Sequence, residues 1–218
     1  MAADILFTFA WLLAASWQGP HYSVTKHSIS DMYANGAPGA WFLLLVITLC
    51  GAAVVLFAWR SLWPSLRDAG RPAAIGAALL GLSIFGLGDL LTPFEREGCR
   101  MADAGCTSSA QTANLGGTLD ATLSTIGVAA LVAAGFFLAA AMRRLPRWHS
   151  WARTTRWGTA GILVLFAADG LSQSSNLSGL FERLLALGGA VALTVLAVGV
   201  RRHTPVGDAP AAQLPVGQ

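Results

Sequence analysis

The segment GAWFLLLVITLCGAAVVLFAWRSL, residues Gly39–Leu62, decides the class of fold. It is longer than the roughly 20 apolar residues that an α-helix needs to cross a bilayer, and it closes with Arg60 and the following Trp63-Pro64. The whole chain has the same character, because 55% of its 218 residues are hydrophobic and only 11% are charged. Soluble domains carry about 25% charged residues. The composition therefore predicts an integral membrane protein.

Five further apolar runs predict the remaining spans of an all-α, polytopic bundle of six transmembrane helices. The expected spans are Ala2–Trp17, Gly39–Leu62, Arg71–Thr92, Asn114–Met142, Trp157–Leu171 and Leu180–Val200. Because the first run lacks a basic start and a small-residue cleavage site, we expect it to remain as a helix. Together these runs predict one membrane domain over residues 1–203. The Pro- and Ala-rich tail, residues 204–218, is expected to be disordered and cytoplasmic.

The basic residues predict the orientation. Ten of the 14 fall on one side of the six-span arrangement, and the other four are Lys26, Arg96, Arg100 and Arg183. The positive-inside rule makes the side with ten cytoplasmic, which predicts a multi-pass cell-membrane protein with both termini inside. Trp148, Trp151 and Trp157 lie among the arginines of the basic loop and are expected at headgroup depth. The sequence has no nucleic-acid-binding motif, so we expect no nucleic-acid partner.

The acidic residues are distributed in the opposite way. Eight of the 11 lie toward the predicted outer side, an asymmetry that membrane topology does not require. Asp89, Asp120 and Asp169 lie in or beside apolar spans, where an ionised carboxylate costs several kcal/mol unless it faces a partner, water or a cavity. We therefore predict that the three converge on one outward-opening cavity and are its catalytic acids, with Asp120 foremost.

Neighbouring polar residues are predicted to complete a substrate-binding site. Thr122 lies on the helix of Asp120, and Gln173 follows Asp169 at helical spacing. Asp31, Glu95 and Arg183 are the other candidates, Arg183 as a partner for a buried acid. The alternative is structural: each acid lies at headgroup level or makes an interhelical hydrogen bond.

Cys99 and Cys106 lie in a polar loop, EREGCRMADAGC, on the predicted outer side. A disulfide is permitted outside the cytoplasm, and no histidine lies nearby to complete a metal site. The sequence therefore favours a Cys99–Cys106 disulfide and no bound metal or other cofactor.

The chain combines the outer segment HYSVTKHSISDMYANGAPGAW, the six-span layout and the closing segment GLFERLLALGGAVALTVLAVGV. In these features it resembles a bacterial membrane family catalogued as domain of unknown function 998. The likeness extends from Ile5 to Val200, and its most specific parts are Ser30-Asp31 and Gly179 with Arg183. Family members often carry a histidine where this chain has Asp120. The resemblance implies an architecture and carries no activity.

Two classes of function fit these features. The first is an enzyme that acts on a hydrophobic prenyl or lipid substrate by proton transfer from a carboxylic acid, as small membrane terpene cyclases do. In that case Trp and Phe faces stabilise a cationic intermediate. The second class is a proton- or cation-coupled transporter or sensor, and a non-catalytic assembly subunit is a third alternative. The expected partner is a membrane lipid or a hydrophobic small molecule, and the sequence leaves the oligomeric state open.

Overall fold

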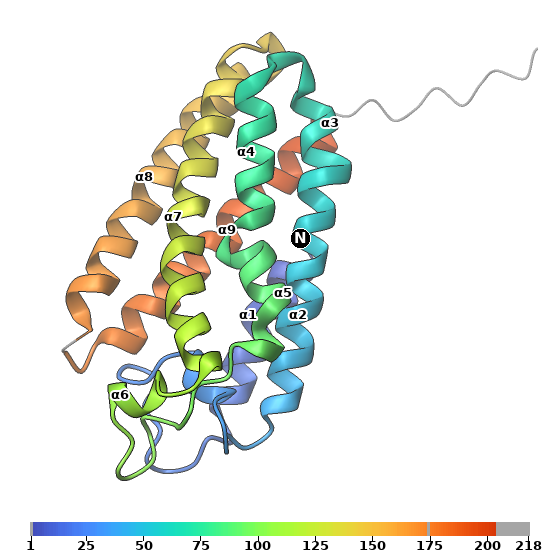
Figure 1. The fold of residues 1–218 in the computed structure, drawn as a ribbon. Helices are drawn as coiled ribbons and strands as arrows, with labels where there is room; N and C mark the ends of the chain where they lie inside the picture. Colours follow the sequence, from blue (N-terminus) through green and yellow to red (C-terminus); the bar gives the residue numbers. More distant parts are fainter. Residues whose placement is uncertain (1, 174, 204–218) are drawn as a thin grey trace, which may run out of the picture.

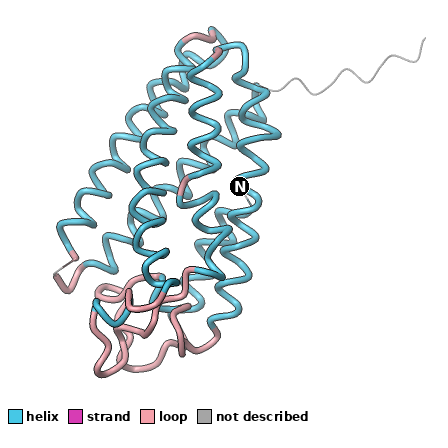
Figure 2. The backbone as a smooth tube through the Cα atoms, in the orientation of Figure 1, coloured by secondary structure: helices cyan, strands magenta, loops and turns pink. Residues whose placement is uncertain are grey.

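The computed structural model describes residues 2–173 and 175–203, and the described chain is helical with no strand. Figure 1 shows an elongated bundle in which long helices run between two ends of different character. Most of the loop structure gathers at one end, around the short helix α6 (Ser108–Gln111), as Figure 2 shows. The predicted tail, residues 204–218, lies outside the described residues.

Four helical stretches are long and apolar enough to cross a membrane: Ala40–Ala69, Arg71–Phe94, Leu115–Arg143 and Ser178–His203. They include α2 (Ala40–Phe57), α3 (Trp63–Leu66), α4 (Arg71–Leu82), α5 (Asp89–Leu91), α7 (Leu115–Arg143) and α9 (Ser178–His203). Large apolar side chains such as Trp41, Leu45 and Trp59 are exposed along these stretches. An apolar exterior of this kind suits lipid rather than water. The fold therefore indicates a multi-pass membrane protein, and four of the six predicted spans meet the requirement.

The other two predicted spans differ from expectation. The first is α1 (Ala2–Ala15), whose 14 residues extend about 21 Å, less than the roughly 30 Å hydrocarbon core. It begins halfway along the bundle, where the carbonyl of Ala3 accepts a hydrogen bond from Cys50 of α2. Beside it, the carboxylate of Asp4 accepts one from Thr194 of α9. The second of the two is the predicted fifth span, which lies in α8 (His149–Ser172). This helix is long enough to cross a membrane, but its first half is polar and it is not among the four apolar spans.

The third apolar stretch is broken in its middle. Ser83, between α4 and a π-helical turn over Ile84–Gly88, has an extended ψ of 174°. Its hydroxyl donates to the carbonyl of Leu80 at 2.7 Å, so the break satisfies part of its own backbone. Gly51 of α2 lies against the restarted helix, where a Cβ would collide with the main chain of Leu90. The break and this close approach place Phe85 and Asp89 in the bundle interior.

The neighbouring helices pack in the order α4, α7, α8 and α9, and α1 packs against α2 and α9. The end opposite the loops carries most of the arginines and is closed by Trp148, which follows Pro146 in a 3-10 turn and is fully buried. Its ring packs against His203 of α9 at 4.6 Å between centroids, so Trp148 at this end contacts protein rather than the exterior. Trp157, by contrast, is 68% exposed, as a residue at a lipid interface would be.

Candidate functional site

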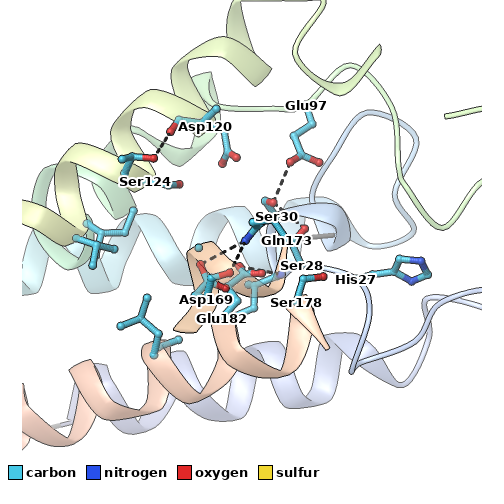
Figure 3. A pocket seen from close by; sticks show the side chains of 18 of the residues that line it. His27, Ser28, Ser30, Glu97, Asp120, Ser124, Asp169, Gln173, Ser178 and Glu182 are labelled. Carbon is cyan, nitrogen blue, oxygen red and sulfur yellow. Dashed lines mark hydrogen bonds between the residues drawn. The ribbon is translucent and has the colours of Figure 1, made fainter. Parts of the chain in front are cut away.

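A cavity of about 1140 Å³ opens in the loop-side half of the bundle. Side chains from α1, α2, α5, α7, α8 and α9 line it, together with the segments 26–33 and 97–112. Five carboxyl groups are among them: Asp89, Glu97, Asp120, Asp169 and Glu182. Figure 3 shows four of these acids, from different helices and a loop, around the same space. The three aspartates predicted to converge therefore do line one cavity.

The apolar part of the lining lies deeper than the acids. On α7, Val128 and Leu131 follow Asp120 by two and three turns toward the closed end. On α8, Phe166 precedes Asp169 by one turn, and Phe85 precedes Asp89 in the same way. The cavity therefore has a carboxyl-rich mouth and an apolar, aromatic floor. Phenylalanines and Tyr33 supply its aromatic groups, and no tryptophan of the described chain lines it.

Asp120 is 8% exposed and lies near the start of α7. Asn114 caps the start of this helix, and its side-chain oxygen accepts a hydrogen bond from the amide of Gly117 at 2.8 Å. Tyr33 donates its hydroxyl to Oδ1 of Asp120 at 3.2 Å. The nearby threonines do not contribute, since Thr118, Thr122 and Thr125 all donate to carbonyls of their own chain segment. The partner of Asp120 is thus a loop tyrosine rather than the hydroxyls of its own helix.

Arg96 fixes the position of that tyrosine. Its guanidinium donates to the carbonyls of Tyr33 and Ala34, both at 3.1 Å. Tyr33 itself is buried, and the loss of solvent raises the pKa of its hydroxyl well above the usual value. The tyrosine is therefore a hydrogen-bond donor held in place, not a base.

Asp89 is 8% exposed and lines the cavity. Among the described residues, no hydrogen bond or ion pair to its carboxyl group is found, although its main-chain carbonyl accepts from Thr92 at 2.8 Å. Asp169 lies on α8, where Gln173 donates to one of its oxygens at 3.4 Å and the other has no partner in the described chain. These two acids retain unused hydrogen-bonding capacity.

Glu97 and Glu182 anchor the loop that covers the cavity. Glu97 accepts from Ser30 at 3.0 Å and from Gln111 at 2.8 Å. Burial raises the pKa of Glu97 to about 7. Glu182 accepts the amide hydrogen of Ile29 at 3.0 Å. Both acids thus hold the segment around Ser30 against the bundle and face the cavity as well.

Asp31 has a different position from the one predicted for a substrate-binding residue. It is fully buried and accepts amide hydrogens from Met101 and Ala102, within the loop that the Cys99–Cys106 disulfide closes. Burial raises the pKa of Asp31 as well. It does not line the cavity, but Met101 does. Asp31 therefore holds in place the disulfide loop, which covers part of the cavity. The predicted disulfide itself is confirmed.

Three other candidates lie outside the cavity. Arg183 is buried and donates to the carbonyls of His27 and Gly179 at 2.7 and 2.8 Å and to the hydroxyl of Tyr22. The predicted pairing of Arg183 with an acid is not found in the described chain. Glu95 is 2% exposed and lines a separate apolar groove with Leu91, Phe94 and Leu119. Thr122 is exposed on α7.

Gly179, which the family resemblance singled out together with Arg183, lies at the same contact with the loop of His27. A Cβ at this position would collide with the main-chain carbonyl of His27. Ser178 donates to the carbonyl of Lys26 at 2.8 Å, so the start of α9 is attached along the segment 25–29. These contacts fix the cavity-lining Lys26 and His27.

The sequence did not single out Tyr33, Glu97 and Glu182 as site residues. Glu97 and Glu182 belong to the outer excess of acids. Tyr33 is one of two tyrosines in the chain, and nothing in its neighbourhood pairs it with a residue 87 positions away.

Within the described residues, no three His, Cys, Asp or Glu side chains lie close enough together to hold a metal ion. The carboxyl groups are distributed around the cavity instead. A carboxyl-rich mouth above an apolar floor is suited to an amphiphilic molecule, whose polar and apolar ends need different surroundings.

The comparison with family models matches residues 1–199 to the family described as "Protein of unknown function (DUF998)". Because the match covers nearly the whole chain, this protein belongs to that family. Comparisons with curated proteins and with solved structures found no significant match.

Proposed function

We propose that this protein is a membrane enzyme that acts on a hydrophobic prenyl or lipid substrate by proton transfer from a carboxylic acid. The observation that carries the proposal is that Asp89, Asp120 and Asp169 line one cavity, which has an aromatic and aliphatic floor. A soluble substrate would not need that floor, and a purely structural set of acids would not need a cavity of about 1140 Å³. Protonation-initiated cyclisation of a prenyl chain is the most concrete form of this chemistry.

Asp120 is the proposed proton donor. Tyr33 donates to Oδ1 of Asp120, and no residue of the described chain hydrogen-bonds the other oxygen. That oxygen can carry the proton toward a double bond of the substrate. Phe85 and Phe166 line the deeper cavity, where their ring faces can stabilise the positive charge that protonation creates. A second carboxylate, Asp89 or Asp169, then removes a proton from a neighbouring carbon, so the reaction is an isomerisation without a co-reactant.

Deuterium uptake tests this proposal. The protein in lipid nanodiscs is incubated in D2O with geranylgeraniol, and the product is analysed by mass spectrometry. We expect a cyclised product that carries one deuterium on carbon, because the proton comes from a carboxylic acid that exchanges with solvent. Asp120→Asn should lower its rate by about 10²–10⁴-fold, the range typical of general acid catalysis.

The matched control is Asp68→Asn, which changes an exposed acid at the opposite end of the bundle. It should leave the rate unchanged. Unlabelled product, or a full rate in Asp120→Asn, would contradict the proposed chemistry. No turnover of this alcohol by the unmutated protein would contradict the prenyl cyclisation.

A second candidate function, coupled transport of a proton or cation, is favoured by one observation. The span that carries Asp89 is broken at Ser83, and helices broken near the membrane midplane recur in secondary transporters. In this alternative, Asp89 is the coupling group. Uptake of a cation into proteoliposomes that depends on a proton gradient and is lost in Asp89→Asn would support it over the enzyme.

The proposed orientation in the cell membrane places the disulfide loop outside and the arginine-rich end, with the C-terminus, in the cytoplasm. Single cysteines in a background without cysteines test it. An impermeant thiol reagent should label position 104, in the disulfide loop, and leave position 149, at the start of α8, unlabelled in intact cells. The reverse pattern would overturn the orientation.

A further inference from the structure

The ionisable side chains that line the cavity are almost all acids. Five carboxyl groups line it, whereas Lys26 and His27 are its only basic residues in the described chain. Burial lowers the pKa of His27, so it is mainly neutral near pH 7. The polar mouth is therefore rich in hydrogen-bond acceptors and poor in cations.

The three arginines at this end do not supply positive charge to the cavity lining, because each makes its hydrogen bonds to other groups. Arg183 donates to two carbonyls and to Tyr22, and it also lies against the ring of Trp11 at 5.7 Å. Arg96 donates to the carbonyls of Tyr33 and Ala34. Arg100 donates to Gln18 and pairs with Asp103 at 3.4 Å. None of the three lines the cavity.

One acid shows that the cavity has an unmet need for a donor. Asp89 is more than nine-tenths buried, lines the cavity, and has no hydrogen-bond or ion-pair partner among the described residues. A ligand that donates a hydrogen bond would give this carboxyl group the partner that it lacks. An anionic headgroup would instead add repulsion.

We propose that the substrate of this site has a polar end that donates hydrogen bonds and carries no negative charge, a hydroxyl or an amine, and that phosphate and diphosphate headgroups are excluded. This inference rests on the proposed function, since it names the substrate class of the same cavity. The donor group lies at the carboxyl-rich mouth, within reach of Asp89, and the chain lies on the apolar floor below it.

Three ligands with one chain test the proposal: geranylgeraniol, geranylgeranylamine and geranylgeranyl phosphate. Their binding to the full chain in nanodiscs of neutral lipid is measured by native mass spectrometry. We expect the alcohol and the amine to bind at least about tenfold more tightly than the phosphate. The comparison of the alcohol with the amine shows which donor group the cavity binds more tightly. Equal or tighter binding of the phosphate would overturn the proposal.

Variants locate the effect. Asp89→Asn keeps the shape of the side chain and should weaken binding of the amine by about tenfold, with Asp68→Asn as the control that leaves all three affinities unchanged. If Lys26→Gln removes tight binding of the phosphate, that headgroup sits at the mouth and the proposal is wrong. An unchanged amine affinity in Asp89→Asn would also overturn it.

The binding result and the deuterium result fail independently. A preference for alcohol or amine without deuterium uptake contradicts the proton-transfer reaction and supports the headgroup assignment. Deuterium uptake into a product of the phosphate supports the reaction and overturns the headgroup assignment.

Discussion

The two ends of this bundle use their interiors differently. At the arginine-rich end the interior is filled: Leu62, Leu66, Leu138, Met142 and Trp148 are at most 1% exposed. At the loop end, the same helices separate around a cavity of about 1140 Å³ lined by five acids. Charged residues are also placed differently at the two ends. At the filled end, arginines such as Arg67 and Arg147 lie on the surface. At the open end, Asp31, Asp89 and Asp120 are buried.

This difference separates stability from function. A filled interior gains packing energy from each side chain, and removing one leaves a cavity. A hollow interior with buried acids costs stability, and such a cost persists where the site has a task. We therefore expect substitutions at the filled end to reduce stability and substitutions of cavity acids to reduce activity.

Trp148→Ala should have the largest effect on stability. The ring is fully buried between α8 and α9, against Trp151 and His203, and its loss should lower the free energy of unfolding by about 3–5 kcal/mol. Thermal unfolding in detergent, followed by circular dichroism, would measure it. Deuterium uptake by the folded fraction should remain, because the cavity lies at the other end.

The matched control is Trp157→Ala, the same substitution on α8, nine residues further along the chain, at a site that is 68% exposed. It should change the unfolding temperature little in detergent. If the two variants unfold alike, the filled end does not carry the stability assigned to it, and the contrast between the ends fails.

The sequence predicted the parts of this fold that depend on apolar length. Four spans match the expected runs to within a few residues, apart from the extension of the second to Ala69, because a long apolar helix is decided locally. The α1 segment is equally apolar, yet it begins halfway along the bundle, since hydropathy does not determine the depth at which a short helix packs. Hydropathy does not show the break at Ser83 either, since it depends on Gly86, where a Cβ would collide with the carbonyl of Gly81, and on the tertiary contacts of Gly51.

The sequence predicted the site residues that lie within apolar segments better than it predicted the roles of residues that contact the loops. Asp89, Asp120 and Asp169 were expected together because each lies near the loop end of an apolar segment, and the structure places them at one cavity. Asp31 and Arg183 were expected there too, but both satisfy main-chain groups of the loops. Which loop carbonyls and amides need partners depends on the folded path of the chain, and the sequence does not show it.

The smallest expected effect concerns Glu97, which tests whether the open end is destabilised by its own acids. Glu97 is 7% exposed, and burial raises its pKa from the usual 4.5 to about 7. Below about pH 4.5 the group is protonated in both the folded and the unfolded chain. As the pH rises toward 7 the unfolded chain loses this proton first, so the folded protein loses stability across that window.

We therefore expect the unfolding temperature of the protein in detergent to fall between about pH 4.5 and pH 7. Glu97→Gln removes this titration and keeps an acceptor for the Ser30 hydroxyl, so its unfolding temperature should fall less. The corresponding difference in the free energy of unfolding is about 3 kcal/mol at most over the window. Part of the slope should remain, because burial also raises the pKa of Glu95 to about 7. Asp68→Asn, at the filled end, should keep the slope of the unmutated protein. An identical slope in Glu97→Gln would mean that Glu97 does not destabilise the open end, and that its two hydrogen bonds offset its burial at every pH.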